Sequence, residues 1–554
     1  MKLFRRIPPG FIIYFIICQA LFTAANIPFY KRVSDTPPEQ INPLVHKGPT
    51  DYFTYLTFIR ESRDGAWQVP ALYTTEPTQP SAIYVYYIAV GKAARIFSLS
   101  PVAAYHISRL VAAELFFLSV YLVAAALAGK RLAPWAALVG LFSTAPLLPF
   151  GKAVLTDAQQ LRTAGSWWYN LDPVFRADWV PHHHFGVALM LLSIYTMIRW
   201  YSVAGRRLPV TAIGLAFVSS LTYPTTALVL LLWVPVTIWG IRGIREIRGE
   251  KRIGWESGNV KRITAGAVCI AAAAGAGLLI TTREIGKGFP WSQWASWDIA
   301  IWNQQPNFER DFLLSGGLVL LAALPFALKE LVKPRRLERV FAATWLITPY
   351  LLIPFANALG IAKIRFGFLS QFLPAGVFAV MAVSAVLTKI SRRPLRILTL
   401  AALLGIFAWY TYPSTEYFYN WSAYIQQWEA PQTRIPRSIA EAVKYLAKNG
   451  EPHTTVLSDA AAGLILPAFA PVRVYYGHEV HTYDFWGKKR ESVVRFYQVA
   501  MQEDEAAAFL RANDIRYVFY GPSEKSWGAG YGWYRSLPLR TWYQSQDVTV
   551  FEVY

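Results

Sequence analysis

The segment Val102–Ala128 reads VAAYHISRLVAAELFFLSVYLVAAALA, and its only charged residues are Arg109 and Glu114. A helix crosses a bilayer with about 20 mostly apolar residues. This segment is long and apolar enough, so we predict a transmembrane helix. An ionisable residue inside such a helix is costly and usually has a purpose. Glu114 is poorly spaced to pair with Arg109, whose partner is therefore expected on another helix.

The composition of the whole chain agrees with a membrane protein. It has 554 residues, of which 54% are hydrophobic, 15% aromatic and only 16% charged, including 21 Trp. Soluble proteins average about 25% charged residues, and aromatic residues are enriched at membrane–water interfaces. These figures exclude a disordered chain, a rod and a single soluble core, which rarely exceeds about 300 residues.

Charge and cysteine usage exclude further classes. The net charge of +20 is spread over short loops rather than one face, so a nucleic-acid partner is not expected. Cys18 and Cys269 are the only cysteines, and both lie in apolar runs. A disulfide framework and a cysteine zinc site are therefore excluded.

The spans and their orientation follow from apolar runs and basic loops. Lys and Arg in short loops mark the cytoplasmic side. The segment 81–98 is also apolar but carries Lys92 and Arg95. If it crossed the membrane, every later basic loop would face the outer side, so we expect it to lie in the membrane interface. Eleven stretches are predicted to span the membrane: 10–29, 102–128, 133–149, 185–200, 208–221, 222–240, 263–281, 312–330, 340–362, 367–388 and 396–413.

This topology predicts a multi-pass protein of the inner (cytoplasmic) membrane with a cytoplasmic N-terminus. Residues 1–413 form the membrane domain, and residues 414–554 lie outside the cytoplasm. Long outer loops are expected at 30–101, 150–184 and 282–311. The first span follows a basic start and could be a signal peptide, but we favour an uncleaved anchor. Whatever chemistry the protein performs is expected to face outward.

The C-terminal segment is predicted to be a small α/β domain. Helical patterns at 438–448, 488–500 and 504–513 alternate with β-rich runs at 454–457, 472–477, 515–521 and 548–553, which is typical of an α/β layer. Phosphate loops, Ser/His/Asp spacing and metal-ligand clusters are absent from its sequence. We therefore assign it a supporting or acceptor-docking role.

The first outer loop contains a helix start at Pro49-Thr50-Asp51. Apolar or aromatic residues at 52, 55, 56 and 59 then form one face of an amphipathic helix, expected on the outer leaflet. Asp51 or Thr50 could simply cap this helix. Alternatively, Asp51 is a general base that takes a proton from an acceptor hydroxyl as the hydroxyl attacks an activated sugar.

With these features the chain resembles the membrane-embedded glycosyltransferases of the C fold (GT-C), which use polyprenyl-phosphate-linked sugars. It is most similar to the bacterial branch related to protein O-mannosyltransferases and lipid A aminoarabinose transferases. The shared features are an acidic residue after the first span, a Pro-flanked aromatic segment, a span with an early Arg and a short basic turn; here these are Asp51, Pro77–Tyr84, Arg109 and Gly129-Lys130-Arg131. The tail from Gly477-His478-Glu479 to Asp484-Phe485-Trp486 resembles outer domains of such proteins.

The resemblance implies an inverting glycosyltransferase of hexose or pentose units. Its donor would be a polyprenyl-phosphate-linked sugar, and its acceptor an envelope glycan, lipid or protein. Asp51 would be the catalytic base, with Tyr55 on the same helix contacting substrate. Many relatives have Glu directly after that Asp, whereas Tyr52 stands here. No cofactor is expected, because the sugar arrives already activated on lipid.

Further candidates lie in the later outer loops. Asp157 follows the third span and is a second catalytic candidate. His182, His183 and His184 lead into the fourth span and could bind a divalent metal with Asp51 or Asp157. Consecutive residues point in different directions, however, so three metal ligands from this run, and therefore a bound metal, are not expected. We expect one histidine to bind phosphate or sugar, and we choose His183 as the candidate.

Lys363 and Arg365 lie between the ninth and tenth predicted spans, on the outer side. Because Arg supplies a planar bidentate fork, we expect Arg365, assisted by Lys363, to neutralise the donor phosphate. Both could instead contact lipid headgroups. Arg109 is a further substrate-binding candidate. The tryptophans of 282–311 are interpreted as an interface belt.

Two other classes of function remain open on the sequence. A transporter or lipid flippase is disfavoured, because we find no internal repeat and no matched pair of Gly/Pro-broken helices. A non-catalytic envelope scaffold would be consistent with Tyr52 in place of the expected Glu.

Overall fold

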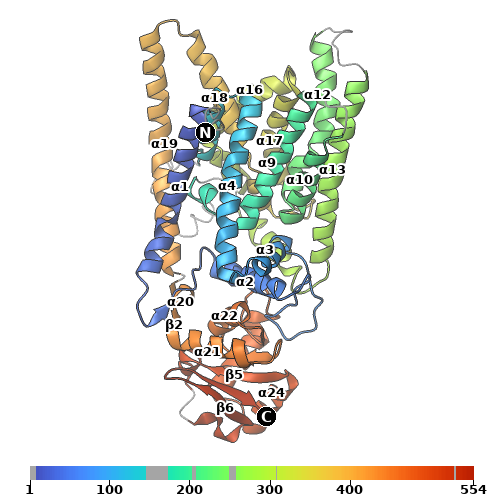
Figure 1. Ribbon diagram of the computed structural model, residues 1–554. Coiled ribbons are helices and arrows are strands. Elements are labelled where there is room, and N and C mark those ends of the chain that lie inside the picture. Colours follow the sequence, from blue (N-terminus) through green and yellow to red (C-terminus); the bar gives the residue numbers. More distant parts are fainter. Residues whose placement is uncertain are drawn as a thin grey trace. The chain divides into compact units, whose positions relative to one another are not determined.

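The computed structural model describes residues 8–144, 173–202, 208–248, 257–306, 308–428, 430–528 and 532–554, and it is largely helical (Figure 1). Within these residues, 7 helices are long and apolar enough to cross a membrane. The chain is therefore a multi-pass membrane protein with an α/β segment at its C-terminal end. The predicted number of eleven spans stays a prediction.

The chain divides into two compact units that interleave along the sequence. The first comprises Met1–Ile27, Arg109–Thr281 and Trp297–Ala423. The second comprises Pro28–Ser108, Thr282–Ser296 and Tyr424–Tyr554. The outer loop 30–101 and the start of the loop 282–311 thus fold with the C-terminal segment.

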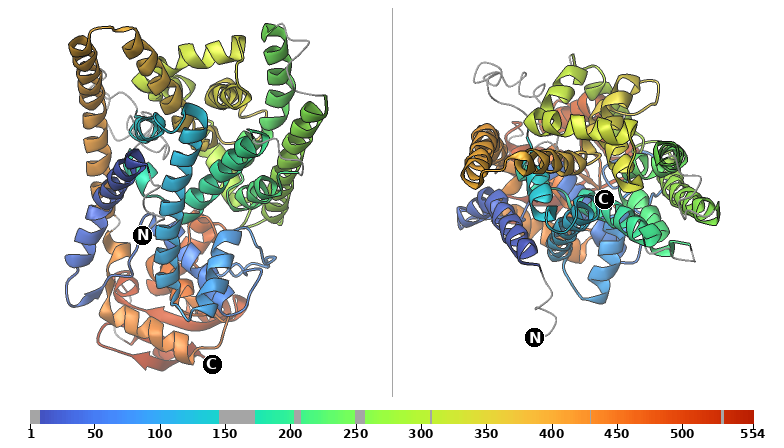
Figure 2. Two further views of the ribbon diagram at one scale, coloured as in Figure 1. Left: turned by 45° about the horizontal axis from the view of Figure 1, so that its top comes forward. Right: turned by 90° about the horizontal axis from the view of Figure 1, so that it is seen from above.

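The first unit is built from helices. α1 (Pro9–Ser34) and α19 (Arg393–Trp428) contribute parts that lie side by side, as do α12 and α13 (Figures 1 and 2). The other elements of this unit, some of which extend beyond it, are α4 (Pro101–Ala128), α5 (Ala133–Leu141), α8 (Pro173–Ala177), α9 (Pro181–Ser202), α10 (Val210–Thr222), α11 (Thr226–Leu231), α12 (Trp233–Arg248), α13 (Ser257–Ile285), α14 (Gln293–Trp302), α15 (Phe308–Ser315), α16 (Gly317–Val332), α17 (Leu337–Leu352), η3 (Ile353–Phe355), η4 (Lys363–Phe368) and α18 (Phe372–Lys389).

Small residues allow close helix crossings in this unit. α5 packs against α18, and a Cβ on Gly376 would lie 2.5 Å from the Ala136 carbonyl oxygen. Such an approach is open to glycine alone and is typical of helix contacts in membranes. α18 also packs on α16, and α9 packs on α10.

The second unit combines helices with a mixed sheet. α2 (Pro49–Arg63) and α3 (Val85–Ile96) come from the first outer loop. The sheet order is β4-β3-β5-β7-β6, in which β4, β3 and β5 are parallel and β7 is antiparallel to both neighbours. The remaining elements are β1 (Gln40–Ile41), α20 (Ala430–Thr433), β2 (Ile435–Pro436), α21 (Arg437–Asn449), β3 (Thr455–Leu457), α22 (Ala460–Phe469), β4 (Arg473–Val474), η5 (Phe485–Lys489), α23 (Arg490–Tyr497), α24 (Glu503–Ala512), β5 (Ile515–Tyr520), α25 (Pro522–Lys525), η6 (Trp533–Ser536), β6 (Leu539–Gln544) and β7 (Thr549–Val553).

Several predicted spans differ from the helices found. The span 312–330 is divided into α15 and α16, because Gly317 takes a left-handed backbone conformation with φ 57° at the junction. The span 340–362 leaves the α-helix after Leu352, and 222–240 is divided between α11 and α12. The last span continues to Trp428, so the predicted boundary at 413 lies inside α19.

Other differences concern single elements. α3 has 12 residues, too few for a span, as expected for 81–98. α22 and β6 were not predicted. The aromatic-belt interpretation is wrong for Trp291 and Trp302, which are buried inside the protein. The end of the predicted span 133–149 lies outside the described residues.

Candidate active site

Asp51 lies in the first turn of α2, as predicted. The helix is preceded by Gly48, which occupies the N-cap position with φ 55° and no side-chain capping bond. That left-handed conformation favours glycine. The N-cap position is therefore occupied by Gly48 rather than by Thr50 or Asp51, which both lie in the first turn. An acidic side chain in the first turn of a helix is favoured by the positive end of the helix dipole.

A group of tyrosines adjoins Asp51. Tyr55 stacks on Tyr87 with ring centroids 4.1 Å apart and planes inclined by 16°, and Tyr87 stacks on Tyr105 at 6.2 Å. Burial raises the pKa of the Tyr87 hydroxyl well above its usual range, and the neighbouring tyrosines and Asp51 raise it further. Asp51 thus lies close enough to Tyr87 to act on it electrostatically.

The helix that carries Asp51 is buried on nearly all sides. α2 packs against α3 on one side and α22 on another, and Tyr52 through Ser62 are all buried. The predicted amphipathic helix with one polar face on the outer leaflet is therefore wrong. The C-terminal segment covers the side that the local pattern left polar.

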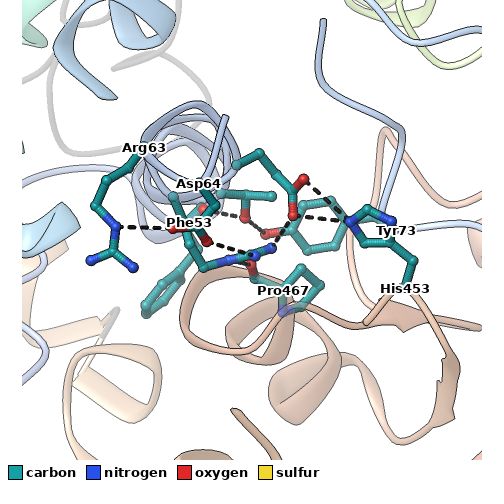
Figure 3. A network of polar contacts seen from close by, with 9 residues as sticks. Phe53, Arg63, Asp64, Tyr73, His453 and Pro467 are labelled. Carbon is teal, nitrogen blue, oxygen red and sulfur yellow. Dashed lines mark hydrogen bonds and ion pairs between the residues drawn. The ribbon is translucent and has the colours of Figure 1, made fainter. Parts of the chain in front are cut away.

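Polar contacts fix α2 to the C-terminal segment (Figure 3). The Arg60 Nε donates to the Pro467 carbonyl at 3.1 Å, and its guanidinium pairs with Glu61 at 2.7 Å. The Glu61 carboxylate also lies 3.3 Å from the His453 Nε2. The hydroxyl groups of Thr57 and Tyr73 lie 3.0 Å apart. Arg60 and Glu61 are buried, so this end of α2 is held by charged groups withdrawn from water.

Lys363 and Arg365, the predicted phosphate ligands, lie on η4 in the first unit. The Lys363 ammonium pairs with Glu309 at 2.7 Å, and the Arg365 guanidinium pairs with Asp298. Burial alone would raise the pKa of Glu309, but the hydrogen bond and charge of Lys363 bring it below its usual value. Both cations are therefore already held by carboxylates, and Arg365 keeps 33% of its side chain exposed.

At the start of α9 the rings of His182 and His183 lie 4.4 Å apart, and His182 also lies 6.4 Å from the Tyr223 ring. His184 has different neighbours. The His183 ring stacks on Tyr223 at 4.3 Å, and the His184 ring stacks on Phe116 at 4.9 Å. The His184 Nε2 lies 3.0 Å from the Arg176 carbonyl oxygen. Arg365 acts electrostatically on His182, His183 and Tyr223, so it lies near them.

A small pocket adjoins these rings. Its wall is largely aromatic and includes both His183 and the Tyr223 side chain. Within the described ranges, no group of three His, Cys, Asp or Glu side chains gathers as metal ligands would. The lining residues are Phe116, Phe175, Trp179, His183, His184, Val187, Tyr223 and Phe368.

Arg109 is buried in an ion pair. Its guanidinium nitrogen donates to the Asp178 carboxylate and to the Asn26 side-chain oxygen, both at 2.7 Å. The side chains of Arg109 and Asp178 are 3% and 1% exposed. Glu114 instead accepts a hydrogen bond from Gln19 at 2.9 Å. This enclosure supports a structural role for Arg109, and its contact with substrate stays a prediction.

The predicted site residues belong to two parts of the chain. Asp51 and Tyr55 lie in the second unit, whereas Arg109, His183, Lys363 and Arg365 lie in the first. The proximity of Asp51 to Arg365 therefore stays a prediction, and Asp157 lies outside the described residues. The sequence analysis did not identify Asp298, Glu309 or Tyr223. The two acids could have been proposed as partners of Lys363 and Arg365, because both lie in the predicted outer loop 282–311.

The comparisons with known proteins bear on the fold. No family model and no curated protein matches the sequence. Among solved structures, the Archaeoglobus fulgidus oligosaccharyltransferase, tethered to an acceptor peptide containing the NVT sequon, is 14% identical with a TM-score of 0.50, covering 91% of this chain and 69% of that one. ArnT from Cupriavidus metallidurans, bound to undecaprenyl phosphate, is 13% identical with a TM-score of 0.46, covering 98% of this chain and 97% of that one. The protein has the GT-C fold.

Proposed function

We propose that this protein is a glycosyltransferase that moves a sugar from a polyprenyl-phosphate donor to a cell-envelope acceptor on the outer face of the membrane. A fold alone does not establish an activity, so the proposal depends on the site. The observation that carries it is Asp51, an acidic residue in the first turn of a buried helix, close enough to the buried Tyr87 hydroxyl to act on it electrostatically. Support for the donor class comes from the GT-C fold.

The proposed reaction is a single displacement. The acceptor hydroxyl oxygen attacks the anomeric carbon while the Asp51 carboxylate takes the hydroxyl proton. The bond between the anomeric carbon and the phosphate oxygen breaks, and its electrons leave with the polyprenyl phosphate. The configuration at the anomeric carbon is inverted, as expected when one displacement occurs.

Arg365 and Lys363 are proposed to hold the phosphate that leaves. A guanidinium carries five N–H donors, so Arg365 can keep Asp298 on one edge while it binds phosphate with another. Asp298 would then orient the guanidinium before the donor arrives. Charge that develops on the leaving phosphate is stabilised best by donors already in place.

The test is the substitution Asp51→Asn in the full chain, reconstituted with a polyprenyl-phosphate sugar. We expect sugar transfer to fall by about 100-fold or more, with little change in the KM for the donor, because Asn cannot take the proton. Asp64→Asn is the matched control, since Asp64 follows the same helix and its side chain is 51% exposed. Unchanged transfer in the Asp51 variant would refute the proposed base.

Membrane insertion and thermal stability of both variants must match those of the wild type. The transporter interpretation would be favoured by a different result. In that case the wild type and both variants would move lipid across the bilayer equally well, and none of them would transfer sugar.

A further inference from the structure

A cavity of about 330 Å³ lies in the first unit, and none of the candidate active-site residues lines it. Three parts of the chain form it: the start of α1, the turn between α4 and α5, and α5 itself. Its volume falls within the range of ligand pockets, about 300–1,000 Å³. The lining residues are Pro8, Gly10, Ile13, Lys130, Arg131, Pro134, Trp135 and Leu138.

The lining is divided by chemistry. Ile13, Pro134, Trp135 and Leu138 make most of it apolar, and Ile13 and Trp135 are each about half exposed. α1 and α5 nearly touch here, because a Cβ on Gly10 would lie 2.9 Å from the Pro134 Cγ. These residues offer a surface that an acyl chain can cover.

The polar part of the lining is cationic. Lys130 and Arg131 are exposed side chains of the turn. Neither makes an ion pair with a carboxylate of the described chain, in contrast to Lys363 and Arg365. Two free cations beside an apolar surface complement an anion that carries a hydrocarbon tail.

We propose that this cavity binds one anionic phospholipid, with the phosphate on Lys130 and Arg131 and an acyl chain along Ile13, Trp135 and Leu138. The basic turn predicts that this side is cytoplasmic, where the leaflet is anionic and each nearby Lys or Arg favours binding. Tryptophan at such a position also suits the membrane–water boundary. The site is independent of the proposed sugar transfer.

The test uses the purified full chain in detergent, with native mass spectrometry to count bound lipid. Dioleoyl phosphatidylglycerol should be retained as one tight equivalent, whereas dioleoyl phosphatidylcholine should not be. In K130Q/R131Q we expect the affinity for phosphatidylglycerol to fall about tenfold or more. K389Q/R392Q removes the same charge at the C-terminal end of α18 and just after it, and should keep the wild-type affinity.

A second arm separates lipid from free phosphate. Trp135→Ala should weaken phosphatidylglycerol binding while leaving both cations in place, and inorganic phosphate should not displace the bound lipid at equal concentration. Equal retention of the two lipids, unchanged binding in K130Q/R131Q, or displacement by inorganic phosphate would each overturn the proposal. Folding of each variant is checked by monodispersity and thermal unfolding, and both glutamine pairs lie at exposed positions.

Discussion

Arg365 is the residue whose surroundings change its interpretation most. Its predicted position on the outer side indicates a phosphate ligand, yet its guanidinium is held by Asp298, which is itself buried. An ion pair of this kind orients the cation and also competes with an incoming anion. The same holds for Lys363 and Glu309, of which the Glu309 side chain is the more exposed.

We predict that Arg365→Gln raises the KM for the polyprenyl-phosphate donor by about 10- to 100-fold, the loss expected for a hydrogen bond to a charged group. Arg365→Lys should recover only part of it, because the ammonium lacks the bidentate fork. Steady-state kinetics with varied donor measure both. The control is Lys389→Gln, at the C-terminal end of α18, which should leave the donor KM unchanged. If Arg365→Gln also left the donor KM unchanged, Arg365 would not belong to the donor site.

At the scale of single elements, α2 shows how far a local pattern can be read. The helix begins at Pro49, as the sequence predicts, and Asp51 lies in its first turn. Its surroundings could not be predicted, because Pro467 and His453 are some 400 positions away in sequence. The polar residues Arg60 and Glu61, which look like a solvent-exposed end, are buried against these partners (Figure 3).

We predict that Arg60→Ala destabilises the protein by about 3–5 kcal/mol, because it leaves the buried Glu61 carboxylate without its cation. Arg63→Ala is the matched control on the same helix, since Arg63 pairs with the exposed Asp64 and surface pairs are worth about 1 kcal/mol or less. Thermal unfolding of the full chain measures the difference.

The double variant Arg60→Ala/Glu61→Gln should be more stable than Arg60→Ala alone, because a neutral amide needs no cation. If Arg60→Ala and Arg63→Ala unfolded at the same temperature, the buried pair would contribute no more to stability than the exposed one.

At the scale of the whole molecule, segments far apart in sequence meet at His481 in the second unit. Its ring stacks on His478 at 4.4 Å and lies 5.7 Å from Trp291 and 6.2 Å from Tyr73. Burial lowers the pKa of His481 from 6.5 to about 3, and the pKa of His478 is lowered for the same reason. The tail, the first outer loop and the segment after α13 therefore share a core that excludes charge.

This core predicts a dependence of stability on pH. Because the folded state keeps these imidazoles neutral, their contribution is present in full above pH 6.5 and is lost as the pH falls from there towards the folded-state value of about 3. The melting temperature of the wild type should fall as the pH is lowered from 7.5 to 5. They should fall less steeply for His481→Gln, and least for His478→Gln/His481→Gln; identical slopes would contradict the assignment.

The membrane class, many of the helices and the α/β character of the tail could be predicted from local patterns along the chain. Runs of apolar residues, helix starts such as Pro49 and alternating strand patterns are local, and local energetics decide them. The GT-C resemblance rested on the same local features.

The pairing of charged residues could be known only from the folded structure. The pairs Arg365–Asp298, Lys363–Glu309, Arg109–Asp178 and Arg60–Glu61–His453 join residues from separate segments or bury neighbours that look exposed. The physical reason is that a buried charge must find a partner wherever the fold brings one, and no periodicity along the chain records that choice. The burial of the helix that carries Asp51 likewise depends on the tail, because Pro467, which contacts Arg60, is some 400 positions away in sequence.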